Sequence, residues 1–151
     1  MRKYWNTALA LLFLAAAWQT GSAQEKAAEG KTLKVKLNYT GAGPVDEKHK
    51  IYLFLFDTPD FVKTPSDAMP IGGENATAKD ATVTFTAVSA SPVYLVAIYD
   101  PTGGYEGMSA PPSGSSLGMY SKEPGQPGPI AIDASKPTKI DLAFDDSFKM
   151  P

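Results

Sequence analysis

The sequence predicts an all-β protein, an antiparallel Greek-key β-sandwich of about seven short strands. Residues 82–86 alternate between polar and apolar side chains, which is typical of a strand with one exposed face. Residues 93–100 are apolar on both faces, which is typical of a strand inside a sheet. No stretch shows a sustained helical period, so we expect antiparallel pairing throughout, because parallel neighbours usually need helical crossovers.

Five further segments complete the expected set of strands. Residues 32–40 alternate clearly, and residues 50–57 are apolar on both faces, which predicts a place in the middle of a sheet. A short edge strand near residues 69–72 is expected within a stretch rich in proline and glycine. Residues 130–133 and 138–144 are expected to close the fold.

The N-terminus has the pattern of an export signal in residues 1–23. Two basic residues precede the uncharged, mainly apolar run 7–18, and small residues at 21–23 fit a cleavage site. The run is short for a bilayer span, and the chain has no cysteine that could carry a lipid anchor. We therefore expect cleavage before Gln24, no membrane anchor afterwards, and a periplasmic or secreted protein.

The rest of the chain divides into three expected parts. Residues 24–31 form a flexible leader, residues 32–146 form the sandwich domain, and residues 147–151 form a C-terminal tail. Within the domain, residues 100–129 hold half of the chain's glycines and prolines and predict one long loop. Loops of this length are often functional, so this loop is the expected interaction surface.

Composition excludes several classes of function. The formal net charge of −2 argues against nucleic acid as a partner, because phosphate binding needs a basic surface. The absence of cysteine excludes thiol catalysis and thiolate metal sites. Lys34 and Lys36 are expected on the outer face of a sheet edge, which lysine protects from other chains. Alternatively, the strand at 32–40 pairs with a partner by strand addition.

Three segments carry a resemblance to a known architecture. IYLFLFDTPDF at 51–61, VYLVAIYD at 93–100 and GMYS at 118–121 resemble the transthyretin-like (prealbumin-like) sandwich. More narrowly, they are similar to a family of exported bacterial proteins of unknown function, over residues 33–144. In that family the strand at 93–100 forms part of a central hairpin, and the acidic loop that follows it implies a calcium site.

The same fold includes a hydrolase of purine breakdown, whose activity does not carry over to this chain. That enzyme relies on several histidines and a C-terminal Tyr-Arg-Gly-Ser. This chain has one histidine and ends in Phe-Lys-Met-Pro.

The candidate site residues lie in or beside the long loop. Tyr99, Tyr105 and Tyr120 are the candidate ligand-binding residues, because exposed aromatic rings beside glycines suit sugars or extended peptides. The alternative is that Tyr99 and Tyr120 pack the loop onto the sheet. Asp100 and Glu106 are the candidate calcium ligands, or else solvated turn residues, and no other cofactor is expected.

Two further patterns bear on catalysis and metal binding. Gly114 to Gly118 matches the G-x-S-x-G nucleophile motif around Ser116, but no helix is expected after it and His49 is the sole histidine base. Four methionines are expected to fill gaps in the core rather than to bind metal. They are Met69, Met108, Met119 and Met150.

We therefore expect a non-catalytic binding or accessory module of the bacterial envelope, acting on an unknown envelope protein or a glycan. One alternative is a carbohydrate-binding module. Another is a small secreted hydrolase, which needs a cleft with two carboxylates or Ser116 within hydrogen-bond reach of His49.

Overall fold

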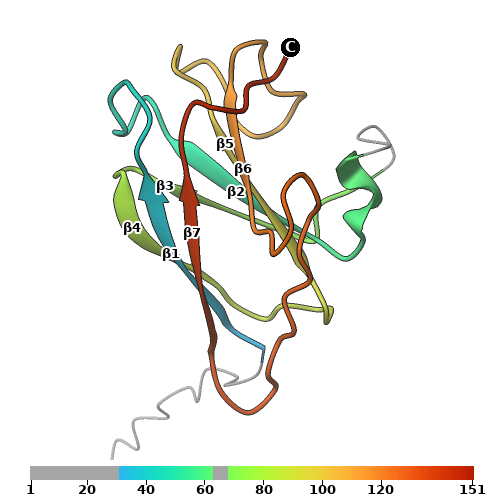
Figure 1. Ribbon diagram of the computed structural model, residues 1–151. Helices are drawn as coiled ribbons and strands as arrows, with labels where there is room; N and C mark the ends of the chain where they lie inside the picture. Colours follow the sequence, from blue (N-terminus) through green and yellow to red (C-terminus); the bar gives the residue numbers. More distant parts are fainter. Residues whose placement is uncertain (1–30, 63–67) are drawn as a thin grey trace, which may run out of the picture.

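The computed structural model describes residues 31–62 and 68–151, so the expected signal peptide and nearly all of the expected leader lie outside it. Seven strands form two sheets, and no α-helix occurs in the part described (Figure 1). The three-stranded sheet has the order β4 (Asp80–Phe85), β1 (Leu33–Tyr39), β7 (Thr138–Phe144). The four-stranded sheet has the order β3 (Gly72–Ala76), β2 (Ile51–Phe56), β5 (Tyr94–Tyr99), β6 (Ser116–Met119). A short 3-10 helix, η1 (Pro59–Val62), follows β2.

One hydrophobic core joins the two sheets, an arrangement compatible with a β-sandwich. Alternate residues of β1, β2 and β5 supply it, each at most 1% exposed, as the alternation of a strand requires. They are Leu33, Val35, Leu37 and Tyr39; Ile51, Leu53 and Leu55; and Leu95, Ala97 and Tyr99. Burial of each leucine, isoleucine or valine side chain stabilises the folded state by about 1.5–3 kcal/mol relative to leaving it exposed.

The expectation of antiparallel pairing throughout is wrong at one ladder. β1 and β7 pair in parallel, with Leu33 opposite Thr138 and Leu37 opposite Leu142. The other four ladders are antiparallel. No crossover helix is needed between β1 and β7, because the five intervening strands make the connection.

The expected edge position of residues 32–40 is also wrong. β1 is the middle strand of its sheet and is hydrogen-bonded to β4 on one side and β7 on the other. Lys36 lies between Thr82 and Asp141 on the outer face of this central strand. Strand addition by a partner at β1 is therefore excluded.

Several boundaries differ from those expected. The short edge strand lies at Gly72–Ala76 rather than near 69–72, and residues 130–133 form no strand beyond a single bridge from Ile130 to Val93. β4 and β5 lie in different sheets, so they do not form the central hairpin that the resemblance implies. β6 lies within residues 100–129, which were expected to form one irregular loop.

The C-terminal segment (residues 147–151) extends the four-stranded sheet beyond β6. Leu117 N donates to Phe148 O at 2.9 Å, and Met150 N donates to Ser115 O at 2.9 Å. Gly114 N donates to Met150 O at 3.0 Å. The segment thus covers the edge of β6 that faces away from β5.

Candidate binding groove

The outer faces of the two sheets differ in chemistry. The outer face of the three-stranded sheet carries lysine, asparagine, threonine and aspartate, as expected for a face in water. These residues are Lys34, Lys36 and Asn38; Thr82 and Thr84; and Lys139 and Asp141. The outer face of the four-stranded sheet is largely apolar, and contiguous exposed apolar surfaces are typical of interaction sites and ligand-binding grooves.

Cross-strand rows form the floor of a groove on this apolar face. Phe54 of β2 lies opposite Val96 of β5, which lies opposite Met119 of β6. In the next row, Ile98 lies opposite Leu117. The apolar character of both faces of β2 and β5 therefore has two causes, since the inner face packs in the core and the outer face lines the groove.

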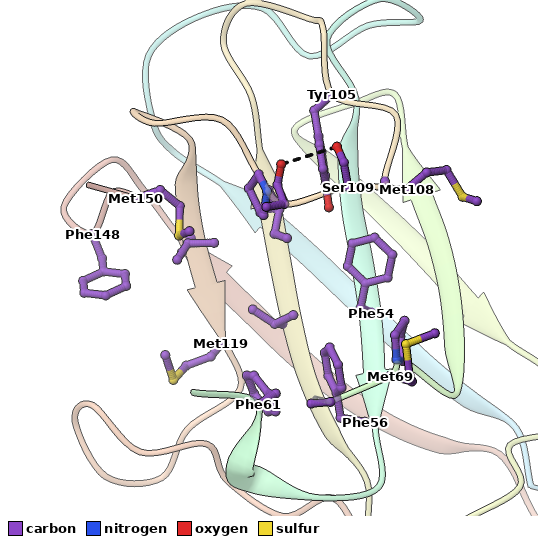
Figure 2. Close-up of a pocket in the computed structure, with 18 of the residues that line it drawn as sticks. Phe54, Phe56, Phe61, Met69, Tyr105, Met108, Ser109, Met119, Phe148 and Met150 are labelled. Carbon is purple, nitrogen blue, oxygen red and sulfur yellow. Dashed lines mark hydrogen bonds between the residues drawn. The ribbon is translucent and has the colours of Figure 1, made fainter. Parts of the chain in front are cut away.

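Three segments outside the strands wall this groove (Figure 2). Tyr105 and Met108 come from the loop after β5, Phe61 and Met69 flank β2 and β3, and Phe148 and Met150 come from the C-terminal segment. The cavity has a volume of about 1020 Å³. Small-molecule sites in proteins typically measure roughly 300–1,000 Å³, so the groove lies just above the upper end of that range.

The most exposed large apolar side chains of the described chain all lie on this groove. Met69 is 77% exposed, Met108 is 92% exposed and Phe148 is 58% exposed. In Figure 2, Met69 and Met108 lie on one side and Met119 and Met150 on the other. The flexible thioether side chain of methionine is suited to surfaces that adapt to a ligand.

The interior of the groove has few polar groups. Lys149 is its one charged lining residue among those described, but it pairs in register with Ser116, whose side chain is buried on the opposite face. Because a residue and its cross-strand partner share a face, the Lys149 side chain leaves its strand on the side of Ser116, and its charge lowers the pKa of Asp146 there. Ser109 donates to the carbonyl of Ala110 at 3.4 Å, and the remaining hydroxyl is that of Tyr105.

A tight turn after β5 fixes the position of Tyr105. The Asp100 carboxylate accepts hydrogen bonds from Thr102 N at 2.8 Å and from Gly104 N and Tyr105 N at 2.9 Å each. Burial raises the pKa of Asp100, but these hydrogen bonds outweigh it and hold the pKa below its usual value. The Tyr105 ring packs edge-on against Tyr52, with the ring centroids 5.1 Å apart.

Asp146 fixes the start of the C-terminal segment. Its carboxylate accepts hydrogen bonds from Ser116 Oγ at 2.6 Å, from the Tyr39 hydroxyl and from Ala42 N at 2.8 Å. The hydrogen bonds from Ser116 and Tyr39 lower the pKa of Asp146 to about 2. One carboxylate therefore joins β1 of one sheet to β6 of the other, directly before the segment that walls the groove.

Comparison with known proteins adds no relative. No protein-family model, curated protein or solved structure matches this chain.

The three candidate tyrosines occupy different environments. Tyr99 is 1% exposed, and its hydroxyl donates to Pro44 O at 2.6 Å. Tyr120 is half-buried and packs against the core. Tyr105 is 6% exposed and is the one of the three that lines the groove. None of them presents a fully exposed ring.

The two candidate calcium ligands do not converge with other acids. The Asp100 oxygens are occupied by the turn, and Glu106 is exposed. Within residues 31–62 and 68–151, no group of three or more His, Cys, Asp or Glu side chains is placed to hold a metal ion.

The G-x-S-x-G pattern lies on β6 and not on a strand-to-helix turn. Ser116 is 1% exposed and donates to Asp146. The Nδ1 atom of His49 contacts Asp46 at 2.9 Å, and no hydrogen bond joins His49 to Ser116 in the part described.

The described part of the chain contains no helix long and apolar enough to cross a membrane.

Sequence reasoning missed the groove because it treated its parts separately. The four methionines expected to fill core gaps all line it, together with Phe148 from the expected tail. A signal was present in the sequence, since β2 and β5 are apolar on a face that no predicted helix could cover.

Proposed function

We propose that this protein is an exported, non-catalytic binding module of the bacterial envelope with a transthyretin-like Greek-key sandwich, and that its ligand binds in the apolar groove. The proposal departs from the sequence-based expectation in placing the interaction on the sheet face rather than on the long loop. The two-sheet, all-β architecture is compatible with the proposed fold.

The observation that carries the proposal is the clustering of exposed apolar side chains. Met69, Met108 and Phe148 lie around one groove, while the opposite sheet has a polar outer face. Apolar surface left in water costs about 25 cal/mol per Å², which a ligand recovers by covering it. The carbohydrate alternative has no comparable support, because the candidate tyrosine rings are packed into the fold.

A fluorescence titration tests the groove as a binding site. The probe is phenylnaphthylamine, a neutral apolar dye without a carbonyl group, whose emission rises in apolar surroundings. We expect saturable binding by the natural protein and at least a tenfold loss of affinity in the triple variant Met69→Gln, Met108→Gln, Phe148→Gln. These side chains are exposed, so the variant is expected to keep its fold.

The matched control changes the opposite face. The double variant Lys34→Gln, Lys36→Gln alters two outward side chains of β1 and should bind the dye like the natural protein. The proposal fails if the natural protein shows no saturable binding, or if both variants bind the dye equally well.

A further inference from the structure

We propose that the groove takes an uncharged, lipid-like small molecule whose neutral oxygen, such as an ester carbonyl, accepts a hydrogen bond from the Tyr105 hydroxyl. This inference rests on the proposed function, since it names the ligand class of the same groove.

The first step is the position of the Tyr105 hydroxyl. The side chain extends from its loop over the sheet into the groove (Figure 2), and it is 6% exposed. Its backbone N–H is held by Asp100 and its ring by Tyr52. The hydroxyl has no hydrogen-bond partner among residues 31–62 and 68–151, and it is not one of their fully buried unpaired polar atoms, so it is open to a ligand or to water in the groove.

The second step is the direction of the hydrogen bond that the hydroxyl can make with a ligand. The hydroxyl of a tyrosine is protonated at neutral pH, burial raises the pKa of Tyr105 further, and the group can therefore donate a hydrogen bond to an acceptor. A ligand oxygen above the floor residues would receive that hydrogen bond while its apolar part covers Phe54 and Val96.

The third step is the charge of the ligand. The floor residues of the groove are uncharged, and its one charged lining residue among those described, Lys149, leaves its strand on the side of Ser116, where its charge lowers the pKa of Asp146. A charge moved from water into apolar surroundings without a partner is strongly disfavoured. The groove therefore selects a neutral molecule over a fatty-acid carboxylate or an ammonium compound.

The fourth step is the kind of occupant. The cavity volume of about 1020 Å³ matches a small-molecule site. Methionines on opposite sides of the groove allow an extended, flexible apolar molecule to be covered in more than one position. These features, together with one tyrosine hydroxyl that has no described protein partner in a mainly apolar interior, favour a small neutral lipid over a protein partner.

The experiment measures displacement of phenylnaphthylamine by three compounds of similar length: methyl laurate, tridecane and laurate. We expect methyl laurate to bind the natural protein about fivefold more tightly than tridecane, the value of one hydrogen bond. Laurate at neutral pH should bind at least tenfold more weakly than its ester. In Tyr105→Phe the ratio of ester to alkane affinity should fall to about one, whereas Tyr120→Phe, the matched control, should keep it.

Three results would overturn the inference while leaving the proposed function intact, since the dye still binds in each. They are equal affinities of ester and alkane, tighter binding of laurate than of its ester, and an ester preference that survives in Tyr105→Phe. Absence of dye binding would instead refute the proposed function.

Light scattering tests whether a second copy of the chain occupies the groove. A natural dimer that becomes monomeric in the triple variant would show that a second copy covers the groove, and this would overturn the inference of a small-molecule ligand.

Discussion

Two aspartates, Asp100 and Asp146, stabilise the chain at the ends of strands near the groove, and each does so by accepting several hydrogen bonds. Asp100 holds the turn that carries Tyr105, and Asp146 holds the junction of β1, β6 and the C-terminal segment. From sequence, Asp100 could be assigned to a turn or to calcium, because either role suits an aspartate after a strand. The structure decides for the turn, because the backbone N–H groups of Thr102 and Gly104 donate to Asp100. The donors to Asp146 lie 30 and 107 positions away in the sequence, so no local pattern predicts its role.

Replacing Asp146 with Asn should destabilise the fold. The substitution removes the charge and turns one carboxylate oxygen into an amide donor, which then faces either the hydroxyls of Ser116 and Tyr39 or the N–H of Ala42. Hydrogen bonds to charged groups contribute about 1.5–3 kcal/mol, and the partial exposure of Asp146 reduces this, so we expect a loss of about 2 kcal/mol. Urea denaturation followed by far-UV circular dichroism measures the free energy of unfolding.

The matched control for this prediction is Asp145→Asn at the adjacent position. Asp145 is exposed, and its carboxylate accepts hydrogen bonds only from the nearby Ser147 in the described structure. We expect a change within about 0.5 kcal/mol, as is usual for surface substitutions. Equal losses in the two variants would contradict the assigned role of Asp146.

At the scale of elements, alternation was sufficient for the longer strands. β1, β2, β4, β5 and β7 lie within about two residues of the predicted segments because each carries an uninterrupted apolar row. β6 was missed because Ser-Leu-Gly-Met is short and its glycine resembles a turn signal. In the fold, Gly118 admits the ring of Phe144, and a Cβ atom there would lie 2.5 Å from Phe144 Cγ. The need for glycine at position 118 therefore comes from its contact with a residue of another strand and not from a turn.

Removing residues 148–151 should weaken ligand binding more than it weakens the fold. The truncation deletes four residues that line the groove, Phe148 and Met150 among them, and leaves the hydrogen bonds of Asp146 in place. It also frees the backbone groups of Gly114, Ser115 and Leu117 at the edge of β6. We expect at least a tenfold loss of affinity for phenylnaphthylamine, a melting temperature lower by a few degrees, and self-association through the open edge.

The single variant Phe148→Gln separates these effects. It keeps the backbone pairing with β6, so it should weaken dye binding without causing self-association. An unchanged dye affinity in the truncated protein would show that the C-terminal segment does not wall the binding site. Dye titration and size-exclusion chromatography provide the two measurements.

At the scale of the whole molecule, the sequence predicted the all-β class but neither the parallel pairing of β1 with β7 nor the groove. The parallel pairing of β1 with β7 joins segments about 100 residues apart, and no local pattern specifies the direction of such a pairing. The groove has the same origin, since η1, the loop after β5 and the C-terminal segment meet over one sheet face only in three dimensions. Alternation predicts which side chains share a face but not what covers that face.

The stability of the whole molecule should fall in acid. The folded-state pKa of Asp146 is lowered to about 2 and that of Asp100 is lowered as well, whereas an aspartate in an unfolded chain has a pKa of about 3.9. As the pH falls, the unfolded chain therefore takes up protons first, which favours unfolding. The contribution of Asp146 is fully present above about pH 4 and is lost between about pH 4 and pH 2. It amounts to about 1–2 kcal/mol after allowance for partial exposure to solvent. Urea denaturation at a series of pH values should show this decline, with a shallower slope in Asp146→Asn. Parallel slopes for the two proteins would show that the carboxylate of Asp146 does not carry the acid sensitivity.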